Sequence, residues 1–201
     1  MTMKDFENNL GDEIRKRTEL LSRVHGEIQE KLATVAGSIV DCLRTGGSVF
    51  ACGNGGSATQ AQHFAAELVG RFKIDRSALP VFCLTDNSAT LTSIANDYRF
   101  EEVFSRQIAG MAKSGDCLLA LSTSGSSENI VHACREARSR GLQVFALTGE
   151  SGGAVAAESH VAIRVPDSQT ARIQEVHLVL IHLICQAVEA AIFCSESSRT
   201  K

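Results

Sequence analysis

The sequence predicts an α/β fold, a three-layer α/β/α sandwich around a doubly wound, five-stranded parallel sheet. Five short apolar runs recur through the middle of the 201-residue chain, and patterns typical of helices lie between them. Several runs are apolar at consecutive positions, as in Cys-Leu-Leu-Ala-Leu at residues 117–121. Such continuous apolarity is typical of a strand that is covered on both faces, as in a parallel sheet. The length fits one domain.

The predicted elements follow one another in β-α-β order. Residues 1–45 have helical character, with Ile28, Leu32 and Val35 at spacings of three and four, and we expect a break near Gly26. Strands are predicted at residues 48–52, 81–85, 116–122, 143–148 and 160–165. Helices are predicted at residues 57–69, 100–111 and 128–140, and Gly141 is typical of the residue that closes a helix.

One long C-terminal helix is predicted after the last strand. Pro-Asp-Ser at residues 166–168 is a start signal, and the helix runs to about residue 193. Its apolar residues surround most of the axis, so it must be covered on several sides. Because one domain of this size cannot cover both terminal helices, we predict that they form a helical bundle between the subunits of a homo-oligomer. The polar tail, residues 195–201, is expected to be frayed.

Composition excludes several classes of protein. The 20 Lys and Arg are balanced by 23 Asp and Glu, whereas a dedicated nucleic-acid binder normally shows a basic excess. Seven cysteines are an odd number without a C-x-x-C pair, so most are expected to be small core residues.

The N-terminus lacks the pattern of a secretory signal, which favours a reducing cytoplasm. Residues 176–194 could span a membrane by length, but four polar groups inside the stretch would be costly in lipid: His177, His182, Gln186 and Glu189.

Two loops at predicted strand ends are suited to binding an anion. Cys-Gly-Asn-Gly-Gly-Ser follows the first strand at residues 52–57, and Ser-Thr-Ser-Gly-Ser-Ser follows the third at residues 122–127. Glycines let backbone N–H groups approach a phosphate, hydroxyls add donors, and a helix N-terminus adds a favourable dipole. Two alternatives remain: both loops are simple turns, or Gly53, Gly55 and Ala58 with Asp86 bind a dinucleotide.

His63 and Glu67 are candidates for acid/base or metal chemistry. They stand four residues apart on the helix that leaves the first loop, so both project from one face. On the long last helix, polar residues such as Arg172, Glu175 and His182 interrupt an apolar surface, and each must be paired or used if it is buried. For His177 we expect an ordinary core histidine.

These segments together resemble the SIS-domain phosphosugar isomerases, and among them the phosphoheptose isomerases. The resemblance covers about residues 30–190 and rests on the joint pattern. Its stretches are Cys-Gly-Asn-Gly-Gly-Ser at 52–57, Ala-Gln-His-Phe-Ala-Ala-Glu-Leu at 61–68 with Gly-Arg at 70–71, Ile-Ala-Asn-Asp-Tyr at 94–98, Phe-Ser-Arg-Gln at 104–107, Ser-Thr-Ser-Gly at 122–125, and Thr-Ala-Arg-Ile-Gln-Glu-Val-His at 170–177 with Ile181 and His182. Ser126 departs from the family, where many members have Asn or Lys.

The resemblance implies a set of functional residues. Glu67 and His182 would be the catalytic acid/base pair. One zinc ion per subunit would be held by His63, Glu67, Gln174 and His182. The phosphate would be held by Ser122, Thr123, Ser124 and Ser127. The sugar site would also be lined by Asn54, Gly55, Gly56, Asn96, Asp97 and Gln174.

The same resemblance implies the reaction and its setting. Residues 46–194 would form the SIS domain that binds the sugar phosphate, and residues 1–45 would pack on it and on neighbouring subunits. The enzyme would be a cytoplasmic homotetramer without a nucleotide cofactor. It would convert D-sedoheptulose 7-phosphate into D-glycero-D-manno-heptose 7-phosphate, the first step toward the ADP-heptose of bacterial lipopolysaccharide.

Two other functions remain open at this point. A DnaA-binding replication initiator factor with the same fold resembles the chain over the same span, so a non-catalytic regulator is one alternative. That relative lacks residues equivalent to Glu67 and His182, which this chain retains. A dinucleotide-dependent enzyme is the other. Gln174 and His182 lie about 12 Å apart along one helix, so we predict that the site lies at a subunit interface.

Overall fold

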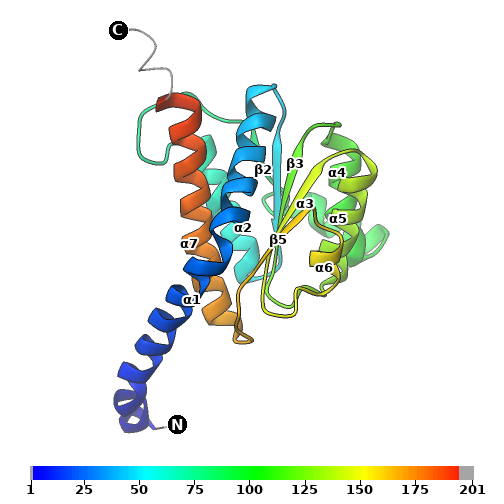
Figure 1. The fold of residues 1–201 in the computed structure, drawn as a ribbon. Helices are drawn as coiled ribbons and strands as arrows, with labels where there is room; N and C mark the ends of the chain where they lie inside the picture. The colour runs from blue at the N-terminus through cyan, green and yellow to red at the C-terminus, as the bar shows by residue number, and fades with distance from the viewer. Residues whose placement is uncertain (1, 195–201) are drawn as a thin grey trace, which may run out of the picture.

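A five-stranded parallel sheet lies at the centre of the computed structural model, which describes residues 2–194 (Figure 1). The strand order is β2-β1-β3-β4-β5, and the predicted α/β fold is confirmed. The strands are β1 (Val49–Gly53), β2 (Val81–Cys83), β3 (Cys117–Ser122), β4 (Gln143–Thr148) and β5 (Val161–Arg164). Every residue of β1 and β3 is buried, which explains their continuous apolarity. The tail at residues 195–201 lies outside the described residues.

Helices cover both faces of this sheet. One face carries α1 (Met3–Arg44), α2 (Gly56–Val69) and α7 (Thr170–Glu189), and α7 continues as a π-helical turn, η2 (Ala190–Cys194). The other face carries α3 (Ser88–Asp97), the 3₁₀ turn η1 (Phe100–Glu102), α4 (Ser105–Met111), α5 (Glu128–Ser139) and α6 (Gly153–Ala157). The sheet therefore separates two apolar cores, as the doubly wound prediction requires.

The first helix, α1, runs without a break, so the predicted interruption near Gly26 is wrong. A glycine inside a helix costs only about 1 kcal/mol relative to alanine. Val24 and Ile28, two positions before and after Gly26, are 3% and 7% exposed, and their burial outweighs that cost. At the N-terminus, Thr2 and Asp5 form a capping box that satisfies the first N–H groups of the helix.

The helix predicted at residues 100–111 is divided in the structure. Its first turn is η1, and α4 begins only at Ser105. Val103 and Phe104, between the two, are 0% and 2% exposed. Consecutive residues of a regular α-helix point about 100° apart, so the irregular step allows both side chains to enter the core. The short helices α3 and α6 have no counterpart in the prediction.

Two of the polar residues of α7, Arg172 and Glu175, form ion pairs although neither is buried. Arg172 Nε donates to Asp167 Oδ2 at 2.7 Å, and this bond lowers the pKa of Asp167 below its ordinary value. Glu175 forms an ion pair with Arg17 of α1, with Nε and Oε2 2.7 Å apart. By length and composition the segment Thr170–Cys194 could cross a membrane, but in this fold α7 packs against α1 and α2 as a core helix.

All seven cysteines lie within the described residues and are free thiols. Five of them are buried, namely Cys42, Cys52, Cys117, Cys134 and Cys185. The prediction that most cysteines are core residues is confirmed.

Candidate active site

The carboxyl ends of β1 and β3 lie side by side at the middle of the sheet. The helix after β1, α2, covers one face, and the helix after β3, α5, covers the other. The connections therefore run in opposite directions at this point. In open α/β sheets, ligands bind in the crevice at such a switch point. The two loops that the sequence identified, residues 52–57 and 122–127, both lie there.

The first loop leads directly into α2. Gly55 has a φ of +55° and occupies the N-cap position of the helix, where no side chain caps the first N–H groups. Asn54 exchanges two hydrogen bonds of 2.8 Å with Asn129 in the first turn of α5. The side chain of Asn54 therefore ties the first loop to the helix that follows the second loop.

The second loop is held by its own hydroxyls. Ser122 Oγ accepts a hydrogen bond of 3.1 Å from the N–H of Gly125 and lies 3.4 Å from Ser127 Oγ. Ser124 Oγ accepts from the N–H of Ser126 at 3.2 Å. Ser127 is the N-cap of α5, and no side chain caps that helix. A compact loop with hydroxyls next to an uncapped helix N-terminus is suited to an anion such as a phosphate.

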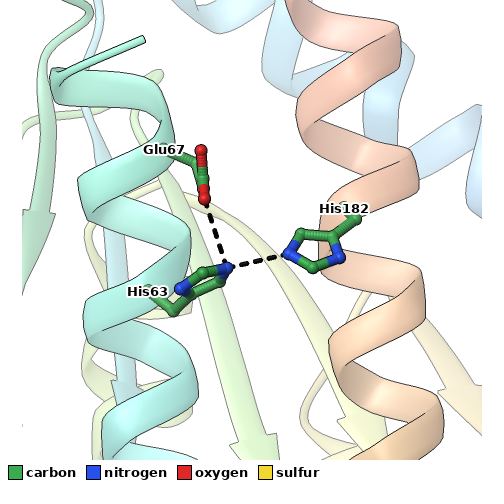
Figure 2. Close-up of side chains that lie close together, drawn as sticks. All are labelled: His63, Glu67 and His182. Carbon is green, nitrogen blue, oxygen red and sulfur yellow. Dashed lines mark hydrogen bonds and ion pairs between the residues drawn. The ribbon is translucent and has the colours of Figure 1, made fainter. Parts of the chain in front are cut away.

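The candidate catalytic cluster joins α2 to α7. The side chains of His63 and Glu67 on α2 and of His182 on α7 point toward one another (Figure 2). The two histidine Nε2 atoms lie 2.8 Å apart, and His63 Nε2 lies 3.3 Å from Glu67 Oε1. The side chain of Glu67 is 23% exposed and that of His63 is 40% exposed. The cluster is therefore accessible on a single chain and can exchange protons with a bound molecule.

The same cluster fits a metal ion by its donor set. The ligand atoms of His63, Glu67 and His182 all lie within 4.8 Å of one another. Two imidazoles and one carboxylate are a frequent ligand set of catalytic zinc, which leaves a further coordination position open. The residues present therefore fit zinc.

Two groups of residues predicted for the site lie apart from this cluster. Gln174 lies against the start of α2. Its side-chain amide is so close to Gly56 that a Cβ atom on that glycine would lie only 2.7 Å from the amide. His63 is two turns further along α2. Asn96 and Asp97 lie exposed at the end of α3, where Asn96 Nδ2 donates to Asp97 Oδ1 at 2.9 Å.

Sequence reasoning missed Asn129 and Phe72. Asn129 is buried and pairs with Asn54, and the ring of Phe72 stacks on that of His182 with centroids 5.8 Å apart. Phe72 directly follows the Gly-Arg of the family pattern, which was the only signal near it. Asn129 had none.

His177 is a core histidine, as the sequence suggested, rather than part of the cluster. It is 0% exposed, and its Nε2 lies 3.2 Å from the carbonyl oxygen of Thr148. Its Nδ1 is buried without a hydrogen-bond partner among the described residues. Burial lowers the pKa of His177 from 6.5 to about 4, so the folded protein keeps this ring neutral.

This lowered pKa predicts a loss of stability in acid. Below pH 6.5 the unfolded chain protonates His177 while the folded chain does not, so folding is progressively disfavoured until the pH reaches about 4. The contribution amounts to about 3 kcal/mol across this range. Urea unfolding between pH 7.5 and 4 should show that His177→Gln loses correspondingly less stability than the wild-type chain. Parallel pH profiles for the two chains would contradict the prediction.

Comparisons with known proteins show which family this chain resembles in sequence and in fold. The family model of the SIS domain matches residues 14–149. The phosphoheptose isomerases of Shewanella sp. strain ANA-3 and of Shewanella oneidensis are each 48% identical over 169 residues, which cover 83% of this chain and 86% of theirs. The structure of phosphoheptose isomerase GmhA from Neisseria gonorrhoeae matches with a TM-score of 0.87 and 37% identity, over 92% of this chain and 99% of the other. The chain belongs to the SIS-domain family and, within it, to the phosphoheptose isomerases.

Proposed function

We propose that the chain is an aldose–ketose isomerase that converts D-sedoheptulose 7-phosphate into D-glycero-D-manno-heptose 7-phosphate. The observation that carries the proposal is the cluster of Glu67, His63 and His182, which shares α2 with one of the two loops suited to a phosphate. Relatives at 48% identity that carry the name phosphoheptose isomerase support the seven-carbon substrate. The product would enter the synthesis of the ADP-heptose of bacterial lipopolysaccharide.

The reaction moves one proton between two neighbouring carbons. A base removes a proton from C1 of the ketose, and protonation of the C2 oxygen gives an enediol. The conjugate acid then protonates C2, and the C1 hydroxyl proton leaves to form the aldehyde. We assign these transfers to Glu67 and His182, because both lie on the same cluster and a carboxylate and an imidazole can exchange protons near neutral pH. Ser122, Thr123, Ser124 and Ser127 would hold the phosphate.

We also propose that the cluster holds one zinc ion per subunit through His63, Glu67 and His182. Such an ion would supply Lewis-acid polarisation of the sugar carbonyl. Within one chain the side chain of Gln174 lies at the start of α2, so a neighbouring subunit would have to supply Gln174 as the fourth ligand. Asn54, Gly55, Gly56, Asn96 and Asp97 would contact the sugar. Since Asn54 is paired with Asn129, its contact with the sugar would come from an amide that is already fixed in place.

We propose that the enzyme is a cytoplasmic homotetramer whose active site is completed by a neighbouring subunit. The N-terminal part of α1 extends beyond the sheet (Figure 1). Several large apolar side chains of α1 and α7 are exposed on the single chain: Leu10, Ile14, Leu21, Val179 and Leu183. Their burial between subunits would produce the predicted helical bundle and would cover the exposed side of the cluster.

The function is tested by incubating the purified chain with sedoheptulose 7-phosphate in D₂O. We expect the aldose to form with deuterium at C2, which NMR detects directly. Thermal shift should show stabilisation by the heptose phosphate and none by NAD or NADP. Binding of the sugar phosphate without turnover would instead favour the non-catalytic regulator, and stabilisation by a dinucleotide alone would favour the cofactor-dependent enzyme.

A further inference from the structure

A buried ion pair lies next to the candidate catalytic cluster. Arg76 belongs to the loop after α2, and Glu189 is the last residue of α7. Arg76 Nε and Glu189 Oε1 are 3.2 Å apart, and the two side chains are only 2% and 4% exposed. A buried ion pair is costly to desolvate, and apolar side chains of similar volume often stabilise a fold equally well. Stability alone therefore does not account for these two residues.

The guanidinium group of Arg76 closes the end of α2. Its Nη2 donates to the carbonyl oxygen of Glu67 at 2.9 Å, and its Nη1 donates to that of Leu68 at 2.7 Å. The last carbonyls of a helix have no partner within the helix, and a cation at this end is favourable. Arg76 therefore fixes the backbone of the residue that supplies the carboxylate of the cluster.

The carboxylate of Glu189 holds the loop that follows α2. It accepts hydrogen bonds from the backbone N–H groups of Phe72 at 3.1 Å and Lys73 at 2.8 Å. Burial by itself raises the pKa of Glu189, but these N–H donors and the Arg76 guanidinium outweigh it, so the pKa lies below its ordinary value. Glu189 is therefore ionised and anchors the loop to α7.

The anchored loop places an aromatic ring on His182. The rings of Phe72 and His182 are stacked, with centroids 5.8 Å apart and planes inclined by 29°. Glu189 lies seven residues after His182, which is two helical turns along the same face of α7. Glu189 thus holds the backbone of Phe72 while its ring reaches back along α7 to the histidine.

We propose that Arg76, Glu189 and Phe72 are positioning residues that fix His182 relative to Glu67 and His63. The ion pair links the end of α2 to the end of α7, and Phe72 restricts the orientation of the histidine ring between them. None of the three needs to touch the sugar. This proposal deepens the proposed function, and its kcat readout rests on that function. The zinc affinity does not, because it depends only on how His63, Glu67 and His182 are placed.

The test uses Phe72→Leu, with Phe72→Tyr as the conservative variant. A matched control is Phe82→Leu, because Phe82 stacks on Phe50 in the same way, with centroids 5.6 Å apart and an angle of 25°, but lies on β2. Zinc affinity is measured by competition with a chromogenic chelator, and kcat and KM are measured with sedoheptulose 7-phosphate. We expect Phe72→Leu to lose about tenfold in zinc affinity and in kcat, with KM changed less than about twofold.

Phe72→Tyr should restore both values, and Phe82→Leu should leave both at the wild-type level. Unchanged zinc affinity in Phe72→Leu, or an equal loss in Phe82→Leu, would overturn the proposal. Arg76→Lys keeps the charge but cannot bond to both carbonyls of α2, so it should also weaken zinc binding. A wild-type chain that binds zinc but does not turn over the sugar would refute the proposed function alone, since the zinc titration still measures positioning.

Discussion

Replacing Glu67 by Gln is expected to lower kcat for the isomerisation by about a thousandfold. The amide has nearly the same size but can neither accept nor return a proton from carbon. The loop that is proposed to hold the phosphate, residues 122–127, does not include Glu67, so KM for the sugar phosphate should change much less. Steady-state kinetics give both constants, and incorporation of solvent deuterium at C2 reports the proton transfer itself.

A matched control for this substitution is Glu19→Gln on α1. The side chain of Glu19 is 66% exposed, and among the described residues its carboxylate takes part only in a surface contact of 3.9 Å with Arg15 Nε, so the control should leave kcat unchanged. Zinc content is measured in parallel, because Glu67 is also a candidate ligand. Turnover of Glu67→Gln at the wild-type rate would remove Glu67 from the acid/base pair.

The sheet could be predicted from sequence because its central strands carry a strong signal. β1, β3 and β4 are buried along nearly their whole length, so each appears as a continuous apolar run. α3 lacked such a signal, because Ile94 is its only buried residue. Its start depends on one local bond, from the N–H of Thr90 to the side chain of Asn87. The error at Gly26 had the opposite cause, because tertiary packing overrode a local preference.

The candidate site could be predicted only in part, because helical periodicity relates near neighbours in the sequence but not residues on separate elements. His63 and Glu67 are neighbours by helical periodicity alone. His182 lies 119 residues after His63 in the sequence, and the family resemblance, not spacing, indicated that it belongs with them. The contacts of Phe72, Arg76 and Glu189 depend on how the loop after α2 folds back onto α7. Such contacts have no periodic pattern, so they become visible only in three dimensions.

The loop that is expected to hold the phosphate, residues 122–127, needs a glycine at position 125 because of its backbone conformation and its close contact with Gly152. Gly125 has a φ of +68°, and a Cβ atom there would overlap the carbonyl group of Gly152. Residues 122–127 therefore contact the start of α6 directly, since the N–H of Val155 in α6 also donates to Gly125 O at 2.9 Å. A side chain at position 125 must displace this loop from the start of α6.

Gly125→Ala is accordingly expected to raise KM for the sugar phosphate by tenfold or more, since even one misplaced hydrogen bond to a charged group costs about 1.5–3 kcal/mol. Gly46→Ala separates this effect from backbone strain. Gly46 has a φ of +82°, but nothing lies within 4 Å of its Cβ position. Both variants should lose about 1 kcal/mol or more of unfolding free energy through strain, whereas only Gly125→Ala should bind the substrate poorly. Equal KM values for the two variants would show that residues 122–127 do not hold the phosphate.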